Sequence, residues 1–124
     1  MNNCIFCNLP ADRIVNEYKH FFIIRDLFPV TNLHSLVIPK RHIVSYFECN
    51  KDEYDEIPII LNTQKIELRL SDDTITGFNI GMNIGEDAGQ TVFHFHIHII
   101  PRRKGDVDYP KGGVRGVIPD KQKY

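Results

Sequence analysis

The sequence predicts an α+β domain, with an antiparallel sheet of about five strands and one main helix. Short β-rich segments lie in both halves of the chain, whereas a helical apolar pattern occupies only the middle. At 124 residues, the chain is long enough for a single modest core. Strands grouped on either side of one helix, instead of alternating with several helices, favour an antiparallel sheet.

Three strands are expected in the first 40 residues. Residues 13–15 and 20–25 have strand composition, and the polar residues 16–19 form the turn between them. A third β-rich segment runs from His34 to about Ile38. Pro39 closes it, because proline cannot donate a hydrogen bond to a strand ladder.

The main helix is expected after residue 50. Asn50 followed by Glu53 is a capping signal. Pro58 conflicts with one continuous helix, so we expect it to begin the main helix after a short turn at 51–56. The polar residues 71–74 then end the helix. The apolar residues that recur at helical spacing are Ile57, Ile60, Leu61 and Leu68.

Two further strands are expected after the helix. Residues 76–85 alternate apolar with small or polar side chains, as a half-buried strand does. Residues 86–90 form a glycine-containing turn, and residues 92–100 form the last strand. We expect a domain over residues 1–106, with residues 107–124 as a basic tail of the same domain, rich in proline and glycine.

Composition is that of an ordinary soluble globular protein, with 42% apolar and 25% charged residues. The net charge of −1 produces no bulk field that would attract nucleic acid or a membrane. Residues 102–124 nevertheless carry a local charge of +4, which either binds phosphate or is simply solvated. No apolar segment is long enough to span a membrane, and the first residues lack a secretory leader, so we expect a cytoplasmic protein. Three cysteines, an odd number, argue against a disulfide framework.

Three histidines, His94, His96 and His98, alternate with Phe95 and Ile97. In a strand they share one face, with successive imidazoles about 7 Å apart. They could be a solvated polar face, or a metal site that needs strand curvature and further ligands. The third interpretation is phosphate chemistry, in which one imidazole attacks phosphorus and the others donate to phosphoryl oxygens.

The segment H-F-H-I-H-I-I at 94–100 resembles the H-x-H-x-H-x-x signature of the histidine-triad (HIT) family of nucleotide hydrolases and transferases. Residues 32–42 and 83–92 are similar to two other family segments, with Leu33 where glycine is common. The resemblance covers about residues 4–106. It implies a HIT-like fold, a two-fold homodimer, a nucleotide substrate, and no cofactor for the chemistry.

The resemblance also implies roles for individual residues. His96 is the expected nucleophile, forming a covalent nucleotidyl-histidine that water hydrolyses. His94, His98 and His34 orient it or hydrogen-bond the phosphate. Asp26 is expected to bind the ribose, although it could merely cap a turn. Residues expected near the phosphates are Asn83, Gln90 and Thr91, and those expected at the base are Phe6, Ile24 and Leu27.

Asn83 and Thr91 are also common turn residues. Gly85 and Gly89 are expected to supply turn geometry and not a phosphate cradle, because no helix N-terminus follows them.

Cys4 and Cys7 have the spacing of half a zinc site. Some bacterial family members with this pair bind zinc between it and two histidines, which here correspond to His42 and His94. Such a closed site would be structural. The alternative is two reduced cysteines packed as small apolar residues. Cys49 has no assignable partner.

The segment I-I-P-R-R-K-G-D-V at 99–107 resembles the branch of the family that cleaves dinucleoside polyphosphates such as diadenosine tetraphosphate. Arg102, Arg103 and Lys104 would then bind the charged leaving group, unless they are only solvated. Two alternatives remain open: a hydrolase of nucleoside 5′-phosphoramidates, and a nucleotide-binding sensor with little turnover. The tail could reach across a dimer interface or cover a site.

Overall fold

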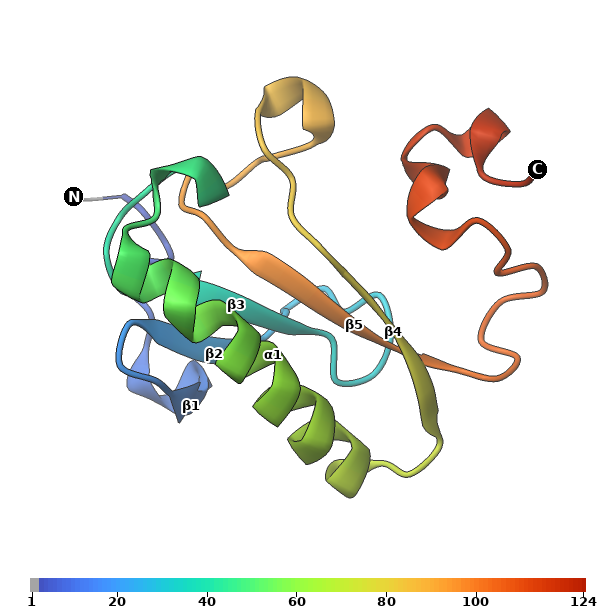
Figure 1. Ribbon diagram of the computed structural model, residues 1–124, viewed down its shortest axis with the longest axis horizontal. Helices are drawn as coiled ribbons and strands as arrows, with labels where there is room; N and C mark the ends of the chain where they lie inside the picture. The colour runs from blue at the N-terminus through green and yellow to red at the C-terminus, as the bar shows by residue number, and fades with distance from the viewer. Residues whose placement is uncertain (1–2) are drawn as a thin grey trace.

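Five strands form one antiparallel sheet, as predicted, and their order in the sheet is β1-β2-β3-β5-β4 (Figure 1). The computed structural model describes residues 3–124. Strand β5 lies between β3 and β4, so the last strand of the sequence is at the interior of the sheet. The strands are β1 (Ile14–Glu17), β2 (Phe21–Arg25), β3 (Ser35–Pro39), β4 (Ile75–Gly81) and β5 (Ile97–Arg103).

The helix α1 (Lys51–Ser71) crosses one face of the sheet (Figure 1). Asn50 and Glu53 form the predicted capping box, with the Asn50 side chain accepting from the Glu53 N–H and the Glu53 side chain accepting from the Asn50 N–H. The expected break at Pro58 is wrong, because the helix continues through it. An interior proline costs about 3 kcal/mol, and burial of one helix face on both sides of Pro58 offsets that cost. The buried residues of this face are Glu53, Ile57, Ile60, Gln64 and Leu68.

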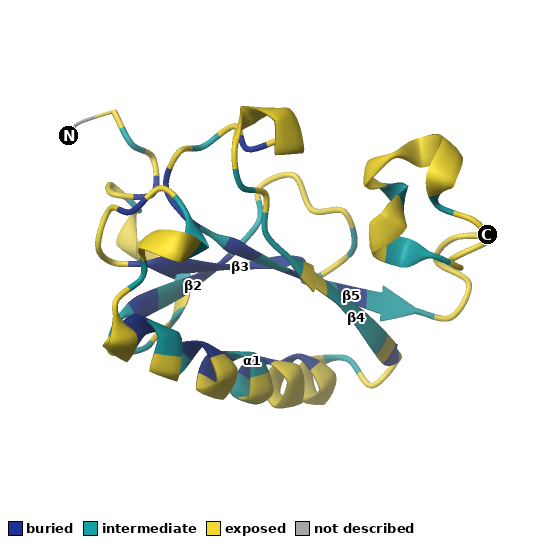
Figure 2. Cartoon of the chain, turned by 45° about the horizontal axis from the view of Figure 1, so that its top comes forward, coloured by how far each residue is buried: buried dark blue, intermediate teal, exposed yellow. Residues whose placement is uncertain are grey.

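Apolar side chains pack on both faces of the sheet. Figure 2 shows buried residues along the strands and along the side of α1 that faces them. On the helix face, Ile57, Ile60 and Leu68 meet residues from β2, β3 and β5. On the opposite face, the N-terminal segment packs through Phe6 against Ile24 and other strand residues. Burying one such side chain contributes about 1.5–3 kcal/mol. The sheet is therefore covered on both faces at its β2–β3 end.

Strand β5 begins later than predicted. The expected strand covered residues 92–100, whereas β5 spans Ile97–Arg103. Before Ile97, the Phe95 N–H donates to the carbonyl of Ile43, at 2.6 Å, and so leaves the sheet ladder. The predicted alternation still holds on the apolar side, because Phe95, Ile97 and Ile99 are all in the core.

The last residues fold as a separate cap beside β4 and β5 (Figure 1). Two short 3₁₀ helices, Gly113–Val117 and Pro119–Lys121, pack on each other there. Other short 3₁₀ helices in the described chain are Ala11–Arg13, Tyr46–Glu48 and Glu86–Ala88. Among the described residues, no helix is long and apolar enough to cross a membrane.

Candidate active site

The three histidines of the 94–98 segment do not have equivalent environments. His94 is fully buried, whereas His96 and His98 are half-buried, with ring centroids 5.2 Å apart. The early departure of residues 94–96 from the ladder turns His94 toward the N-terminal cysteines. The segment therefore has a structural end at His94 and an accessible end at His96 and His98.

The hydrogen bonds of His96 determine its tautomer. His96 Nδ1 lies 2.8 Å from the carbonyl oxygen of His94, which can only accept. Nδ1 therefore carries the proton, and the lone pair is on Nε2. The edge of Phe6 packs against the His96 ring, with 5.1 Å between centroids. Backbone and aromatic contacts thus hold the imidazole with an unprotonated Nε2.

A second chain of contacts orients His98. The N–H of Val30 donates to His34 Nδ1, at 3.0 Å, so the proton of neutral His34 is on Nε2. That Nε2–H donates to His98 Nδ1, at 2.9 Å, and lies 3.5 Å from an Asp26 carboxylate oxygen. Neutral His98 therefore carries its proton on Nε2, where it is a hydrogen-bond donor. Asp26 also accepts from the Phe28 N–H, so it does cap a turn while contacting His34.

Burial keeps these imidazoles neutral. It lowers the pKa of His98 to about 4, with further lowering by His96 and His34 and a smaller opposing effect of Asp26. Burial also lowers the pKa of His34, against the opposing charge of Asp26. The pKa of His94 is lowered chiefly by burial as well. Near pH 7, His34 and His98 are thus neutral donors.

Four side chains from three distant segments form a second cluster: Cys4, Cys7, His42 and His94. His94 Nδ1 lies 3.3 Å from Cys4 Sγ and 3.1 Å from His42 Nδ1, and Cys7 Sγ lies 3.1 Å from His42 Nδ1. The Nε2–H of His94 donates to the Pro39 carbonyl, at 2.8 Å, which leaves its Nδ1 lone pair facing the cluster. Two thiols and two imidazoles in this arrangement are a Cys₂His₂ donor set, with the outer hydrogen bond typical of a metal-binding histidine.

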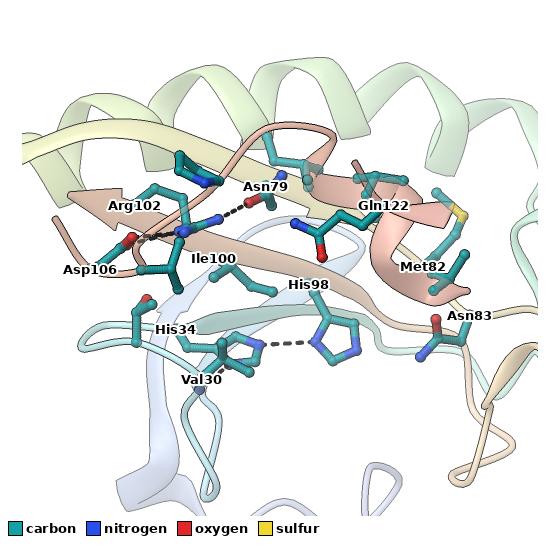
Figure 3. A pocket seen from close by; sticks show the side chains of 18 residues that line it. Val30, His34, Asn79, Met82, Asn83, His98, Ile100, Arg102, Asp106 and Gln122 are labelled. Atoms are coloured by element: carbon teal, nitrogen blue, oxygen red, sulfur yellow. Dashed lines mark hydrogen bonds and ion pairs between the residues drawn. The ribbon is translucent and has the colours of Figure 1, made fainter. Parts of the chain in front are cut away.

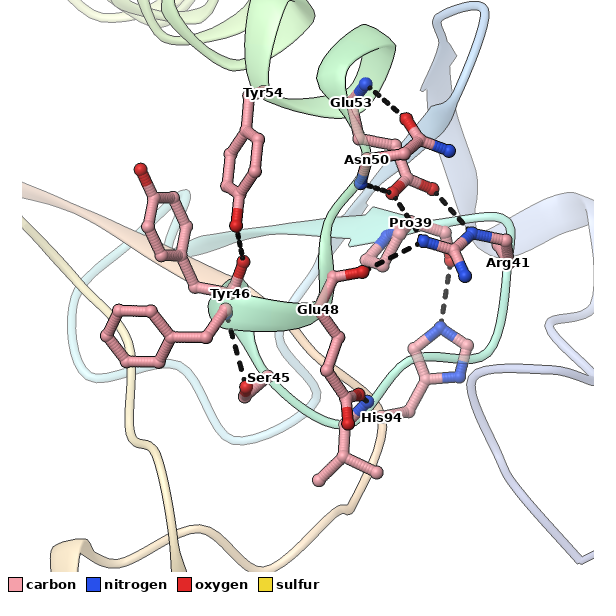
Figure 4. A network of polar contacts seen from close by, with 11 residues as sticks. Pro39, Arg41, Ser45, Tyr46, Glu48, Asn50, Glu53, Tyr54 and His94 are labelled. Carbon is pink, nitrogen blue, oxygen red and sulfur yellow. Dashed lines mark hydrogen bonds and ion pairs between the residues drawn. The ribbon is translucent and has the colours of Figure 1, made fainter.

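A polar network around the buried Glu53 fixes the loop that carries His42 (Figure 4). The Arg41 guanidinium donates to both carboxylate oxygens of Glu53, at 2.8 and 3.1 Å, and to the carbonyl of Glu48. This pairing lowers the pKa of Glu53, which is almost completely buried. The helix cap and the loop at 41–48 are thereby joined, and the sequence alone did not reveal this role of Arg41 and Glu53.

The residues expected near the phosphates differ in their burial. Gln90 is buried, and its amide donates to the carbonyls of Val44 and Val92 while accepting from the Gly85 N–H. It closes the loop between β4 and β5. Thr91 and Asn83 are exposed. Their contacts with substrate remain predictions.

Gly85 and Gly89 have φ values of 92° and 94°. Both supply turn geometry, as predicted, because this left-handed region favours glycine.

The two arginines at the end of β5 are paired with acids. Arg102 donates two hydrogen bonds to Asp106, at 2.7 and 2.8 Å, and a third to Asn79. Arg103 donates twice to Asp72. Both guanidinium groups are therefore engaged in bonds within the protein.

A cavity of about 540 Å³ extends from His34 and His98 toward the C-terminal cap (Figure 3). His34 and His98 line one end of it, and their mutual hydrogen bond is visible in Figure 3. Asn83 and Gln122 also line it. No local sequence pattern indicates Gln122, because its place in this wall depends on how the tail folds back.

This geometry agrees with the comparisons to known proteins. The model of the HIT domain matches residues 10–105. The chain belongs to the HIT family. Members of this family are nucleotide hydrolases or transferases, and its relatives bind nucleotide substrates.

The HIT chain is 41% identical over 113 residues to Protein hit of Bacillus subtilis, covering 84% of this chain and 74% of that protein. It is also similar to a Zn-bound histidine triad family protein from Mycobacterium smegmatis, with TM-score 0.74 and 38% identity over 84% of this chain and 78% of that one. A third similarity is to diadenosine triphosphate hydrolase of Plasmodium falciparum, with TM-score 0.74 and 27% identity over 82% and 68% of the two chains.

Proposed function

We propose that this HIT protein hydrolyses dinucleoside polyphosphates, such as diadenosine tetraphosphate, through a covalent intermediate on His96. The hydrogen bond from His96 Nδ1 to the His94 carbonyl carries the proposal, because it leaves the Nε2 lone pair available for attack. The half-buried position of the ring keeps it accessible to a nucleotide.

The reaction proceeds in two displacements. His96 Nε2 attacks the α-phosphorus, the N–P bond forms, and the P–O bond to the remaining polyphosphate breaks. The leaving oxygen takes the electron pair, and its negative charge is stable on a phosphate. Water then attacks phosphorus, the N–P bond breaks, and the nucleoside monophosphate leaves as the water proton passes to solvent. His98 Nε2–H donates to a phosphoryl oxygen in both steps, oriented by His34.

The phosphoanhydride substrate is supported by two observations. The segment 99–107 resembles the polyphosphate-cleaving branch, and the Plasmodium relative is a diadenosine triphosphate hydrolase. Arg102 and Arg103 would act on the leaving group only indirectly, because their guanidinium groups already donate hydrogen bonds to Asp106 and Asp72. Asp26 would accept the ribose hydroxyls with the carboxylate that also contacts His34.

Cys4, Cys7, His42 and His94 would hold a structural zinc ion. The donor set fits this ion, because all four ligand atoms lie within 4.8 Å of one another and the His94 lone pair faces the thiols. Bound zinc would fasten the N-terminal segment to the sheet, while the chemistry stays with the accessible histidines. The solved Zn-bound relative supports this assignment.

We also propose a homodimer formed through α1 and the edge strand β4. One exposed face of α1 carries Ile59, Ile66 and Leu70. Strand β4, which follows this helix in the chain, is an edge strand of the sheet. Burial of these side chains by a second copy would add to a small core. The three cysteines are free, which fits a reducing, cytoplasmic location.

A product assay tests the function directly. Purified protein is offered diadenosine tetraphosphate and adenosine 5′-phosphoramidate side by side, with His96→Ala as the control. We expect preferential cleavage of the tetraphosphate, and its loss in the variant. Preference for the phosphoramidate would overturn the substrate assignment but keep the nucleophile. Turnover of neither would indicate a nucleotide-binding sensor.

A further inference from the structure

The cavity beside His98 is a candidate for a second binding site within the proposed active centre. Its wall includes His34 and His98 but neither Asp26 nor Phe6, which are expected to bind the first nucleoside. The cavity therefore opens from the histidines in another direction. A ligand that contacts His98 from this side would lie beyond the reacting phosphate, on the leaving-group side.

The cap that closes this cavity has a defined internal structure. Gly112 has a φ of 90°, and a side chain there would collide with the Gln122 carbonyl, because its Cβ would lie 1.8 Å from that oxygen. Arg115 Nε donates to the carbonyls of Lys121 and Gln122, and the Gln122 amide donates to the Lys111 carbonyl. These contacts hold Gln122 where Figure 3 shows its amide directed into the cavity.

The cap presents apolar side chains to the cavity with much of their surface unburied. Val114 and Val117 are 63% and 76% exposed, although both line the cavity. On the sheet side, Ile80 is also exposed. Ile100 and Met82 complete the apolar part of the wall. Exposed apolar side chains that face one another across a cavity gain free energy when a ligand removes them from water.

The polar groups of the wall favour an uncharged ligand. The charge of Arg102 is neutralised by its two bonds to Asp106, and the buried His34 and half-buried His98 are neutral. The remaining polar groups include side-chain amides of Asn83 and Gln122. Apolar walls with amide donors and acceptors match a flat heterocycle with hydrogen-bonding edges. They match a polyphosphate poorly, because it would require free cations.

We propose that this cavity binds the nucleoside of the leaving nucleotide, with the base between Val117 of the cap and the sheet, and Gln122 at its polar edge. The inference rests on the proposed function and makes the cap the part of the chain that selects dinucleotides over mononucleotides. A volume of about 540 Å³ is within the usual range for small-molecule sites.

Ligand binding tests the inference without requiring turnover. In a full-length His96→Ala background, calorimetry measures Kd for diadenosine tetraphosphate and for adenosine monophosphate. We expect the Val114→Ser, Val117→Ser pair to weaken tetraphosphate binding by about tenfold more than monophosphate binding. The matched control is Ile118→Ser, since Ile118 is 59% exposed in the same cap but does not line the cavity.

Equal weakening of both ligands, or the same selective effect from Ile118→Ser, would overturn the inference. So would an unchanged tetraphosphate Kd in the valine pair. The inference is also overturned if the His96→Ala chain binds neither ligand. The proposed function is tested separately, by cleavage of the tetraphosphate by the unmodified enzyme. It stands if that cleavage occurs and is removed if it does not.

Discussion

The N-terminal and C-terminal ends of the histidine segment, residues 94–98, differ in how completely their surroundings are filled by contacts within the protein. On the N-terminal side, His94 is buried and bonded at both ring nitrogens, within a cluster that includes Cys4 and Cys7. On the C-terminal side, His98 opens to a cavity where Val117 remains largely exposed. The closed side resembles a structural metal site, and the open side resembles a ligand site. Histidines four positions apart therefore have different environments, because their partners differ.

The largest effects should distinguish His96 from His94. His96→Ala should lower turnover by at least about 10³-fold, because the attacking atom is lost, with little change in unfolding free energy. His94→Ala should destabilise the protein by about 2–4 kcal/mol, because a fully buried ring and its bond to Pro39 are removed. Steady-state kinetics and urea unfolding on both variants measure these effects. An active His96→Ala enzyme would contradict the proposed mechanism.

Replacing Cys4 and Cys7 together with serine tests the closed side. Elemental analysis should find one zinc per chain in the unmodified protein and none in this variant, with a melting temperature lower by roughly 10 °C. Cys49→Ser is the control, because Cys49 lies outside the cluster, and burial raises its pKa to about 11. Zinc retained without the two cysteines, or absent from the unmodified protein, would remove the metal assignment.

The pH dependence of stability should reflect His98. The pKa of this ring is about 4 in the folded state and about 6.5 when unfolded. Below about pH 6.5 the unfolded chain binds a proton that the folded chain does not yet bind. The free energy of unfolding should therefore decrease as pH falls from about 6.5 to 4, by up to about 3 kcal/mol, and its full value is present above that window.

Urea unfolding between pH 4 and 8 measures this slope. His98→Asn should reduce it. An identical slope in the His98 variant would contradict the origin of the effect. Part of the slope should remain in any case, because the pKa values of His34 and His94 are lowered as well.

The smallest effect is expected at Leu33, which precedes His34. Leu33 has a φ of 71°, a left-handed conformation that costs a leucine about 1–2 kcal/mol. Glycine would relieve this strain, but it would lose the packing of the side chain against the core and would cost backbone entropy. Leu33→Gly should thus change unfolding free energy by less than about 1 kcal/mol. Thermal unfolding measures the stability of Leu33→Gly and, for comparison, of Leu36→Gly. The second change should cost much more, because Leu36 is buried in a strand.

The local order of the chain was determined by the sequence alone. Strand composition predicted the three strands before the helix, and alternating apolar side chains predicted the two after it. The Asn50–Glu53 pair marked the start of the helix, and the 94–98 pattern identified the histidine segment. These features depend on neighbours a few residues apart, so short-range periodicity and capping chemistry are sufficient to predict them. Leu33 was already unusual in the sequence, since it stands where glycine is common, and its positive φ explains that preference.

Only the tertiary structure decided which contacts residues far apart in the sequence make. Cys7 meets His94 across 87 positions, and His34 meets His98 because β3 and β5 are neighbours in the sheet. Continuation of α1 through Pro58 depends on core packing on both sides of the proline. The ring tautomers depend on carbonyl and N–H groups that the backbone path places beside them. These contacts arise from strand order and chain return, and no local pattern encodes them.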